Sequence, residues 1–217
     1  MTRKHLMVLI SGNGTNLQAI IDAINSGYLK DCVIDLVISN RKSAYGLTRA
    51  AEANIPTLVF PLKPYKDSGK SRIDYDLDLA KKIIEFANDH INDNNHKIDM
   101  IVLVGWMHIL SNEFLKFFQK NEGNEETPII NLHPALPGQF DGANAIERAY
   151  EAFKKGEINK TGVMVHKVIV DVDKGQPLLI EEVPILDSDT LNDLESRIHS
   201  VEHRLIVSAI NNYFNIQ

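Results

Sequence analysis

Segments of strand length alternate with segments of helical periodicity over the first two-thirds of this 217-residue chain. The apolar run 6–10 is followed by apolar residues at helical spacing over 17–24 and then by Gly27, which is typical of a helix end. The segment 98–104 is almost continuously apolar, as expected of a strand buried on both faces. The Pro- and Gly-bearing segment 61–71 is expected to be a loop. Because strands that alternate with helices form parallel sheets, we predict an α/β fold with a doubly wound, mostly parallel sheet flanked by helices.

The last third of the chain has a different pattern. The segments 163–170 and 178–183 predict two strands, joined around the turn Asp173-Lys174-Gly175. A capping pattern at Thr190 opens a long helix, which we expect to reach Tyr213. The predicted fold therefore ends in a C-terminal strand pair and a long final helix.

Composition and charge argue against several classes of partner. With a formal net charge of -6 and a pI near 5.7, the chain lacks the basic excess typical of proteins that bind nucleic acid or anionic membranes. No segment has the apolar length of a membrane span. Cys32 is the single cysteine, so no internal disulfide is possible, which fits a reducing compartment. We expect a cytoplasmic protein that binds small molecules, and the sequence does not indicate its oligomeric state.

A glycine-bearing loop, Ser11-Gly12-Asn13-Gly14-Thr15-Asn16, lies between the first predicted strand and helix. Glycines permit a tight turn, and the free N–H groups at a helix start favour a phosphate. The loop is not the dinucleotide fingerprint, because Leu17 replaces the third glycine, and no Lys-Ser/Thr follows as in a Walker loop. It predicts a site for a phosphate monoester, with a plain tight turn as the alternative.

An amide and an imidazole lie two residues apart where the apolar run 129–130 ends in Asn131-Leu132-His133-Pro134. Strand residues at i and i+2 project to the same side, and Pro134 ends the strand. An amide donor beside a titratable ring suits a developing oxyanion and a proton transfer. The alternative is a capping Asn and an interior His.

Asp173, in the late turn, favours the catalytic interpretation of this pair. A carboxylate near an imidazole raises the pKa of the imidazole and so favours its charged form. No serine occupies a nucleophile elbow, so we predict direct transfer of a group to an incoming nucleophile. Ligands of such sheets bind beyond the carboxyl ends of the strands, and we therefore expect segments 12–16, 106–110 and 131–134 to converge on one cleft.

Four motifs of the chain, taken together and in order, resemble the phosphoribosylglycinamide formyltransferases, 10-formyltetrahydrofolate-dependent enzymes of purine synthesis. The motifs are Ile10-Ser11-Gly12-Asn13-Gly14-Thr15-Asn16-Leu17, Gly105-Trp106-Met107-His108-Ile109-Leu110, Asn131-Leu132-His133-Pro134 and Asp173-Lys174-Gly175. The resemblance implies formyl transfer from 10-formyltetrahydrofolate to the amine of N1-(5-phospho-D-ribosyl)glycinamide, without a metal. It also implies one formyltransferase domain over 1–217, with a phosphate-binding half, 1–105, and a folate-binding and catalytic half, 106–217.

The resemblance also implies a role for individual residues. Asn131, His133 and Asp173 would be the catalytic set. Main-chain N–H groups of the glycine-bearing loop would hold the substrate phosphate, and main-chain atoms would line most of the pterin pocket. The implied substrate contacts are Gly14, Thr15, Asn16, Arg72 and Glu202, and the implied folate contacts are Met107, His108, Ile109, Leu110, Asn131, Ile169, Val170, Asp171, Val172 and Asp173.

Some positions depart from the pattern of this family. Ala135 stands where many relatives have Ser, His108 where bacterial relatives often have Arg, and Asn144 where some have His. These changes bear on the folate pocket more than on the reaction. The polar insertions 89–97 and 121–127 have no role that the sequence assigns.

Other functions remain alternatives at this point. A methionyl-tRNA formyltransferase would need a basic C-terminal domain, and a formyltetrahydrofolate hydrolase would need an N-terminal regulatory domain. A non-catalytic binder of phosphorylated metabolites and a nicotinamide-dependent reductase are the rivals from other classes. His199 and His203 have the i, i+4 spacing of a zinc pair, but the Glu of the metalloprotease motif is absent, so no metal site is predicted.

Overall fold

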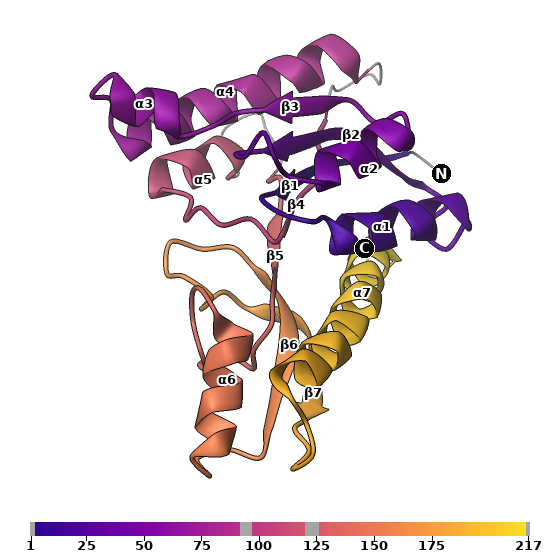
Figure 1. Ribbon diagram of the computed structural model, residues 1–217. Helices are drawn as coiled ribbons and strands as arrows, with labels where there is room; N and C mark the ends of the chain where they lie inside the picture. Colours follow the sequence, from indigo (N-terminus) through magenta and orange to yellow (C-terminus); the bar gives the residue numbers. More distant parts are fainter. Residues whose placement is uncertain (1–2, 92–96, 120–125, 216–217) are drawn as a thin grey trace. The chain divides into compact units, whose positions relative to one another are not determined.

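The fold is seen in a computed structural model that describes residues 3–91, 97–119 and 126–215 (Figure 1). The chain divides into two compact units, residues 1–130 and 131–217. The helices and strands, in chain order, are β1 Lys4–Ile10, α1 Thr15–Asn25, β2 Cys32–Ser39, α2 Gly46–Glu52, β3 Thr57–Val59, α3 Lys63–Asp67, α4 Arg72–His90, β4 Met100–Val104, α5 Asn112–Phe118, β5 Ile129–His133, α6 Ala145–Lys154, β6 Lys160–Lys167, β7 Pro177–Pro184 and α7 Leu191–Asn215.

The strands follow the order β3-β2-β1-β4-β5-β6-β7 in a seven-stranded sheet. In the first unit, β1 pairs in parallel with both β2 and β4, and β2 pairs in parallel with β3. The chain therefore winds outward from β1 to β3 and then returns to the other side of β1. Because such crossovers are right-handed, this reversal puts the helices before and after it on opposite faces. In agreement, α1 packs beside α2, whereas α4 packs beside α3 and α5 (Figure 1). The doubly wound prediction is confirmed.

The core of the first unit is centred on β1 and β4. Residues 6–10 of β1 are fully buried, and all of β4 is buried. Both strands are apolar on both faces, which is what burial between two helix layers requires. The continuous apolar run that predicted β4 is thus explained by its central position.

The second unit ends in the predicted strand pair and long helix. β6 and β7 pair antiparallel, and α7 packs against both strands and against α6 (Figure 1). The start of α7 is capped as expected, because Asp193 Oδ2 accepts the Thr190 N–H at 2.9 Å and Thr190 Oγ1 accepts the Asp193 N–H at 3.2 Å. In the described part of the chain, no helix has both the length and the apolar composition to cross a membrane.

Two local predictions were wrong. The segment 61–71, expected to be a loop, contains the short helix α3, whose first turn accommodates Pro64 because no helical partner needs its missing N–H. The strand expected over 163–170 ends at Lys167, so Ile169 and Val170 lie in the following loop, where both are exposed. Five-residue helices and strand ends are set by tertiary contacts more than by periodicity.

Candidate active site

The predicted phosphate loop of the first unit leads directly into α1. Gly14 is the N-cap of this helix and has φ +78°, a left-handed conformation that favours glycine. A Cβ at Gly14 would lie 2.6 Å from the Cα of Gly46, so the space also requires glycine. No side chain caps this helix end, and its first turn contains no acidic residue. Such a positively polarised end favours an anion, as the sequence predicted.

Arg49, which sequence reasoning missed, holds this loop from α2. Its Nε donates to the Asn13 carbonyl at 3.0 Å, and its Nη2 donates to Asn13 Oδ1 at 2.9 Å. The guanidinium carbon also lies 5.0 Å from the centre of the Tyr45 ring. The arginine is 36 residues from Asn13 in sequence, and no motif relates the two. It adds a fixed positive charge beside the predicted phosphate site.

Replacement of Gly14 by alanine is expected to raise the KM for the phosphorylated substrate and to destabilise the fold by at least about 1–2 kcal/mol. The new Cβ would require both a left-handed alanine and a displacement of the Gly46 main chain. Steady-state kinetics with each substrate varied in turn, together with thermal unfolding, tests this. An unchanged KM for the phosphorylated substrate would show that the loop has no part in binding it.

The loop after β4 lies beside the phosphate loop in the first unit. The Met107 N–H donates to Ser11 Oγ at 2.8 Å, and the Ser11 N–H donates to the Gly105 carbonyl at 3.0 Å. Ser11, the first residue of the glycine-bearing loop, therefore contacts the segment 106–110 through Met107. Along 107–110 the side chains alternate, with Met107 and Ile109 65% and 56% exposed and the side chains between and after them buried.

Arg72, the first residue of α4, contacts the same loop. Its Nη2 donates to the Ile109 carbonyl at 3.3 Å and lies 3.4 Å from His108 Nδ1. The predicted substrate contact and the predicted folate segment are thus neighbours within one unit. His108 and Leu110 are buried, so only the main chain at these two positions is available to a ligand.

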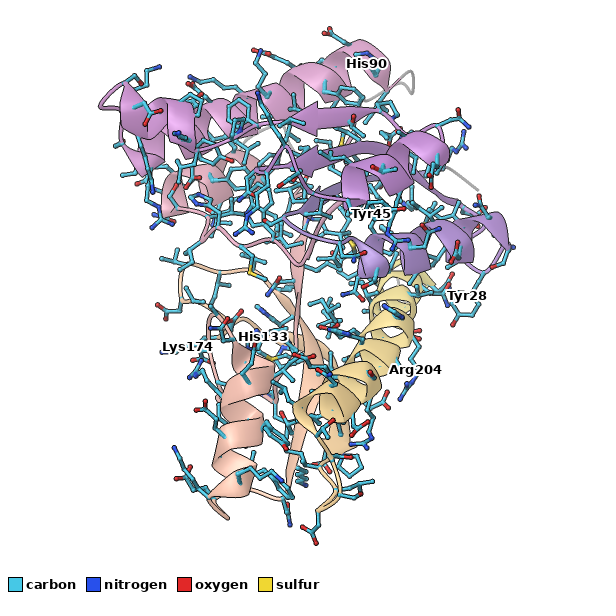
Figure 2. The ribbon with its side chains drawn as sticks, viewed as in Figure 1. Tyr28, Tyr45, His90, His133, Lys174 and Arg204 are labelled. Atoms are coloured by element: carbon cyan, nitrogen blue, oxygen red, sulfur yellow. The ribbon has the colours of Figure 1, made fainter. Side chains whose placement is uncertain are left out.

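The three predicted catalytic side chains lie together in the second unit. Asn131 and His133 come from β5, and Asp173 comes from the turn between β6 and β7. Asp173 Oδ2 lies 3.5 Å from His133 Nδ1, and Asp173 Oδ1 accepts from Asn131 Nδ2 at 3.3 Å. The Gly142 N–H donates to Asp173 Oδ2 at 2.8 Å. Figure 2 labels His133 beside Lys174, which follows Asp173 in the chain.

His166, on β6, completes this group. Its Nε2 lies 3.2 Å from Asn131 Nδ2 and 3.3 Å from Asp173 Oδ1, and its Nδ1 lies 2.9 Å from the Lys167 carbonyl. The ring is almost fully buried. The apolar strand pattern around His166 predicts only that this residue lies in the interior or at an edge of the sheet. Its contacts with Asn131 and Asp173 leave no signal in the sequence.

The His133 imidazole is less basic than the sequence suggested. Burial lowers its pKa below the ordinary value of 6.5, and the negative charge of Asp173 offsets only part of this effect. The nearby His166 lowers the pKa further. For the Asp173 carboxyl, burial alone would raise the pKa, but hydrogen bonds with His166 and Gly142 and the charge of His133 outweigh it and lower the pKa. At neutral pH the arrangement is therefore an ionised aspartate beside a largely neutral His133.

The remaining predicted positions of the second unit differ in their exposure to solvent. Glu202 is buried on α7, and its Oε2 lies 4.0 Å from His199 Nε2. Burial lowers the pKa of His203, and the charge of His199 lowers it further. Among the described residues, no group of three or more His, Cys, Asp or Glu side chains is arranged to hold a metal ion. In the folate segment, Asp171 is exposed and Val172 is half-buried.

The departures from the family pattern are structurally accommodated. Ala135 is fully buried, and Asn144 is the N-cap of α6 with φ +56°, a left-handed conformation that asparagine tolerates.

Most of the two insertions, at 92–96 and 120–125, lies outside the described residues. The division into halves at 105/106 and the single cleft remain predictions.

Comparisons with known proteins show the family of the chain. The chain matches the formyl transferase family over residues 4–210. It is 52% identical over 209 residues to a phosphoribosylglycinamide formyltransferase of Dictyostelium discoideum, covering 95% of this chain and 96% of that protein. It is 50% identical over 211 residues to the enzyme of that name from Schizosaccharomyces pombe, covering 94% of each.

A solved structure has the same fold. The crystal structure of glycinamide ribonucleotide transformylase 1 from Symbiobacterium toebii aligns with a TM-score of 0.80 and 34% identity, and the match covers 97% of this chain and 87% of that chain. Sequence and structure thus agree over nearly the full length, and the chain belongs to the formyl transferase family.

Proposed function

We propose that this chain transfers the formyl group of 10-formyltetrahydrofolate to the amine of N1-(5-phospho-D-ribosyl)glycinamide, giving the N2-formyl product of de novo purine (IMP) biosynthesis. Relatives that share half of their residues with the chain bear that enzyme's name. The observation that carries the proposal is the state of His133: its Nδ1 faces Asp173, while its buried Nε2 has no hydrogen-bond partner among the described residues. A buried ring nitrogen without a partner is costly, and a reacting formyl group would supply one.

In this mechanism the amine attacks the formyl carbon directly, and the protein stabilises the charge that develops on the formyl oxygen. We assign this task to the Asn131 amide and to His133 Nε2. In the structure, Asn131 Nδ2 contacts His166 and Asp173, so one of these contacts is exchanged for the formyl oxygen. This makes Asn131 a donor that is held in place before the reaction starts.

Proton movement follows from the electrostatics of the same group. His133 starts largely neutral, because burial lowers its pKa. Negative charge that develops beside Nε2 raises the pKa of the ring, so His133 gains a proton during the reaction. Asp173 stabilises the resulting imidazolium and orients a water that carries the amine proton to the ring. As the bond between the formyl carbon and N10 of the folate breaks, His133 passes this proton to N10, and tetrahydrofolate leaves.

Binding of the two substrates is assigned to the other predicted residues. Main-chain N–H groups at the start of α1 hold the phosphate, and Glu202 binds near the glycinamide amine. The main chain of 107–110 and the loop 169–173 bind the folate, with the exposed Met107 and Ile109 as apolar contacts. The resemblance implies Arg72 as a substrate contact, but its Nη2 donates to the Ile109 carbonyl, so we assign it to the folate instead. We further propose that the enzyme works in the cytoplasm on small-molecule substrates and without a metal.

The test is a formyl-transfer assay on the purified protein. Formylated product is expected only when both substrates are present, and His133→Asn should lower kcat roughly 10²- to 10⁴-fold with the fold intact. His90→Asn is the matched control, because His90 is exposed and lies on α4 of the other unit. Calorimetric binding of the phosphorylated substrate without any transfer would instead favour a non-catalytic binder. Near-normal turnover of the His133→Asn variant would refute the mechanism.

A further inference from the structure

A buried aspartate–histidine pair in the first unit takes no part in the chemistry assigned above. His108 Nε2 lies 2.6 Å from Asp76 Oδ1, and the two side chains are 4% and 1% exposed. The other carboxylate oxygen, Asp76 Oδ2, accepts the Ser111 N–H at 2.8 Å. One carboxylate on α4 therefore holds both ends of the segment 108–111, which follows β4.

Aromatic rings shield this pair from water. The Tyr75 ring packs edge-on against the imidazole at a centroid distance of 5.1 Å, and the Trp106 ring does so at 6.2 Å. Both aromatic side chains are buried. A buried carboxylate is costly unless it is paired and hydrogen-bonded, so loss of His108 would leave Asp76 with too few partners and would disturb the loop above it.

His108 of this pair also contacts Arg72. Arg72 precedes Asp76 by four residues and so lies on the same face of α4. A guanidinium can only donate, so His108 Nδ1, 3.4 Å from Arg72 Nη2, acts as the acceptor. The single imidazole proton then resides on Nε2 and is donated to Asp76. The contacts define one tautomer of His108 with a different partner on each ring nitrogen.

We propose that Asp76 and His108 are positioning residues for the folate co-substrate, because they fix the main chain of 107–110 and orient Arg72. This inference rests on the proposed function, in which that main chain and Arg72 contact the folate. If the main chain of 107–110 moves, its contacts with the folate are lost, because a change of side-chain rotamer cannot restore a contact made by main-chain atoms. A small displacement of the segment should therefore weaken binding directly.

Three variants of His108 separate the two contacts of the ring. His108→Leu removes both contacts and replaces the ring by an apolar side chain of similar bulk. His108→Gln retains a donor near the Nε2 position for Asp76, and His108→Asn retains an acceptor near the Nδ1 position for Arg72. We expect the KM for 10-formyltetrahydrofolate to rise about tenfold in His108→Leu and less in His108→Gln, since the Asp76 contact is the shorter one. The kcat and the KM for the phosphorylated substrate are expected to stay unchanged, as in the control His90→Asn.

Two readouts separate positioning from mere core packing. Calorimetry with 10-formyltetrahydrofolate should show the same loss of affinity as the KM, at a melting temperature that His108→Gln largely retains. Nitrogen NMR of histidine-labelled protein should show His108 protonated on Nε2 and unprotonated on Nδ1, with this preference lost in Asp76→Asn. A purely structural pair would change the melting temperature and leave folate binding unchanged.

The outcomes keep this inference distinct from the proposed function. A wild-type protein that transfers formyl groups, with His108→Leu and His108→Gln binding folate as tightly as the wild type, overturns the inference alone. A His108 proton on Nδ1 overturns it as well. A wild-type protein that neither binds 10-formyltetrahydrofolate nor transfers its formyl group overturns the proposed function, and the inference with it.

Discussion

Replacement of Asp173 by asparagine is expected to lower kcat for formyl transfer roughly 10²- to 10⁴-fold with little change in the backbone. Asp173 has φ +56°, and asparagine is among the few residues that tolerate this left-handed conformation. The variant therefore removes the charge and keeps the shape of the turn. Asp173→Ala would instead lose the hydrogen bond from Gly142 and strain the backbone as well.

The pKa of His133 provides a second readout for this variant. The charge of Asp173 raises this pKa against the larger effect of burial, so its removal should lower the pKa of His133 further below 6.5. An NMR titration of the imidazole measures the shift, and the acidic limb of the pH–kcat profile should move to lower pH. The exposed Asp187 offers the matched control, Asp187→Asn, which should change neither quantity. A folded Asp173→Asn variant with wild-type turnover would remove Asp173 from the mechanism.

Burial of His133 also predicts how stability depends on pH. Because its pKa is lowered in the folded state, the unfolded chain binds more protons below the ordinary value of 6.5. The lowered pKa of His133 therefore leaves the free energy of unfolding unaffected at higher pH. It destabilises the fold progressively as the pH falls through 6.5 toward the pKa of the folded state. The half-buried His203, whose pKa is lowered as well, acts in the same direction.

Features set by local sequence could be predicted. Thr190 caps α7 by accepting the Asp193 N–H at 3.2 Å, and this cap could be predicted because it depends on residues three positions apart. The alternation of strands and helices likewise determined the parallel sheet. The Asn131–His133 spacing placed two of the predicted catalytic side chains on one strand, and the turn at Asp173 brings the third predicted side chain to them.

Features set by distant partners could not be predicted. The buried contact of His108 joins it to Asp76, 32 residues away on another helix, and the contact of His166 joins it to Asn131 over 35 residues. The direction of the His133 pKa shift was wrong for a related reason. The charge of Asp173 is visible in the sequence, but the burial that outweighs it depends on the packing of the whole unit.

Gly175→Ala is expected to lower kcat about 10²-fold or more and to destabilise the fold by about 1–3 kcal/mol. A Cβ at this position would lie 1.6 Å from the Lys167 carbonyl oxygen and 3.2 Å from His166 Nδ1. The first neighbour is main chain and cannot rotate away, so the turn that carries Asp173 must move. That carbonyl is also the Nδ1 partner of His166, whose ring would be displaced with it.

Gly156→Ala provides the control that separates this effect from a general loss of stability. Gly156 has φ +75°, and a Cβ added there would meet nothing within 4 Å. Its alanine variant should therefore lose about 1–2 kcal/mol through the left-handed backbone alone and keep its kcat. Thermal unfolding and steady-state kinetics on both variants give the comparison. Equal kcat values in the two would mean that the turn adapts to the extra methyl group without moving Asp173. A loss of kcat confined to Gly175→Ala would show that catalysis depends on how closely the turn packs against β6.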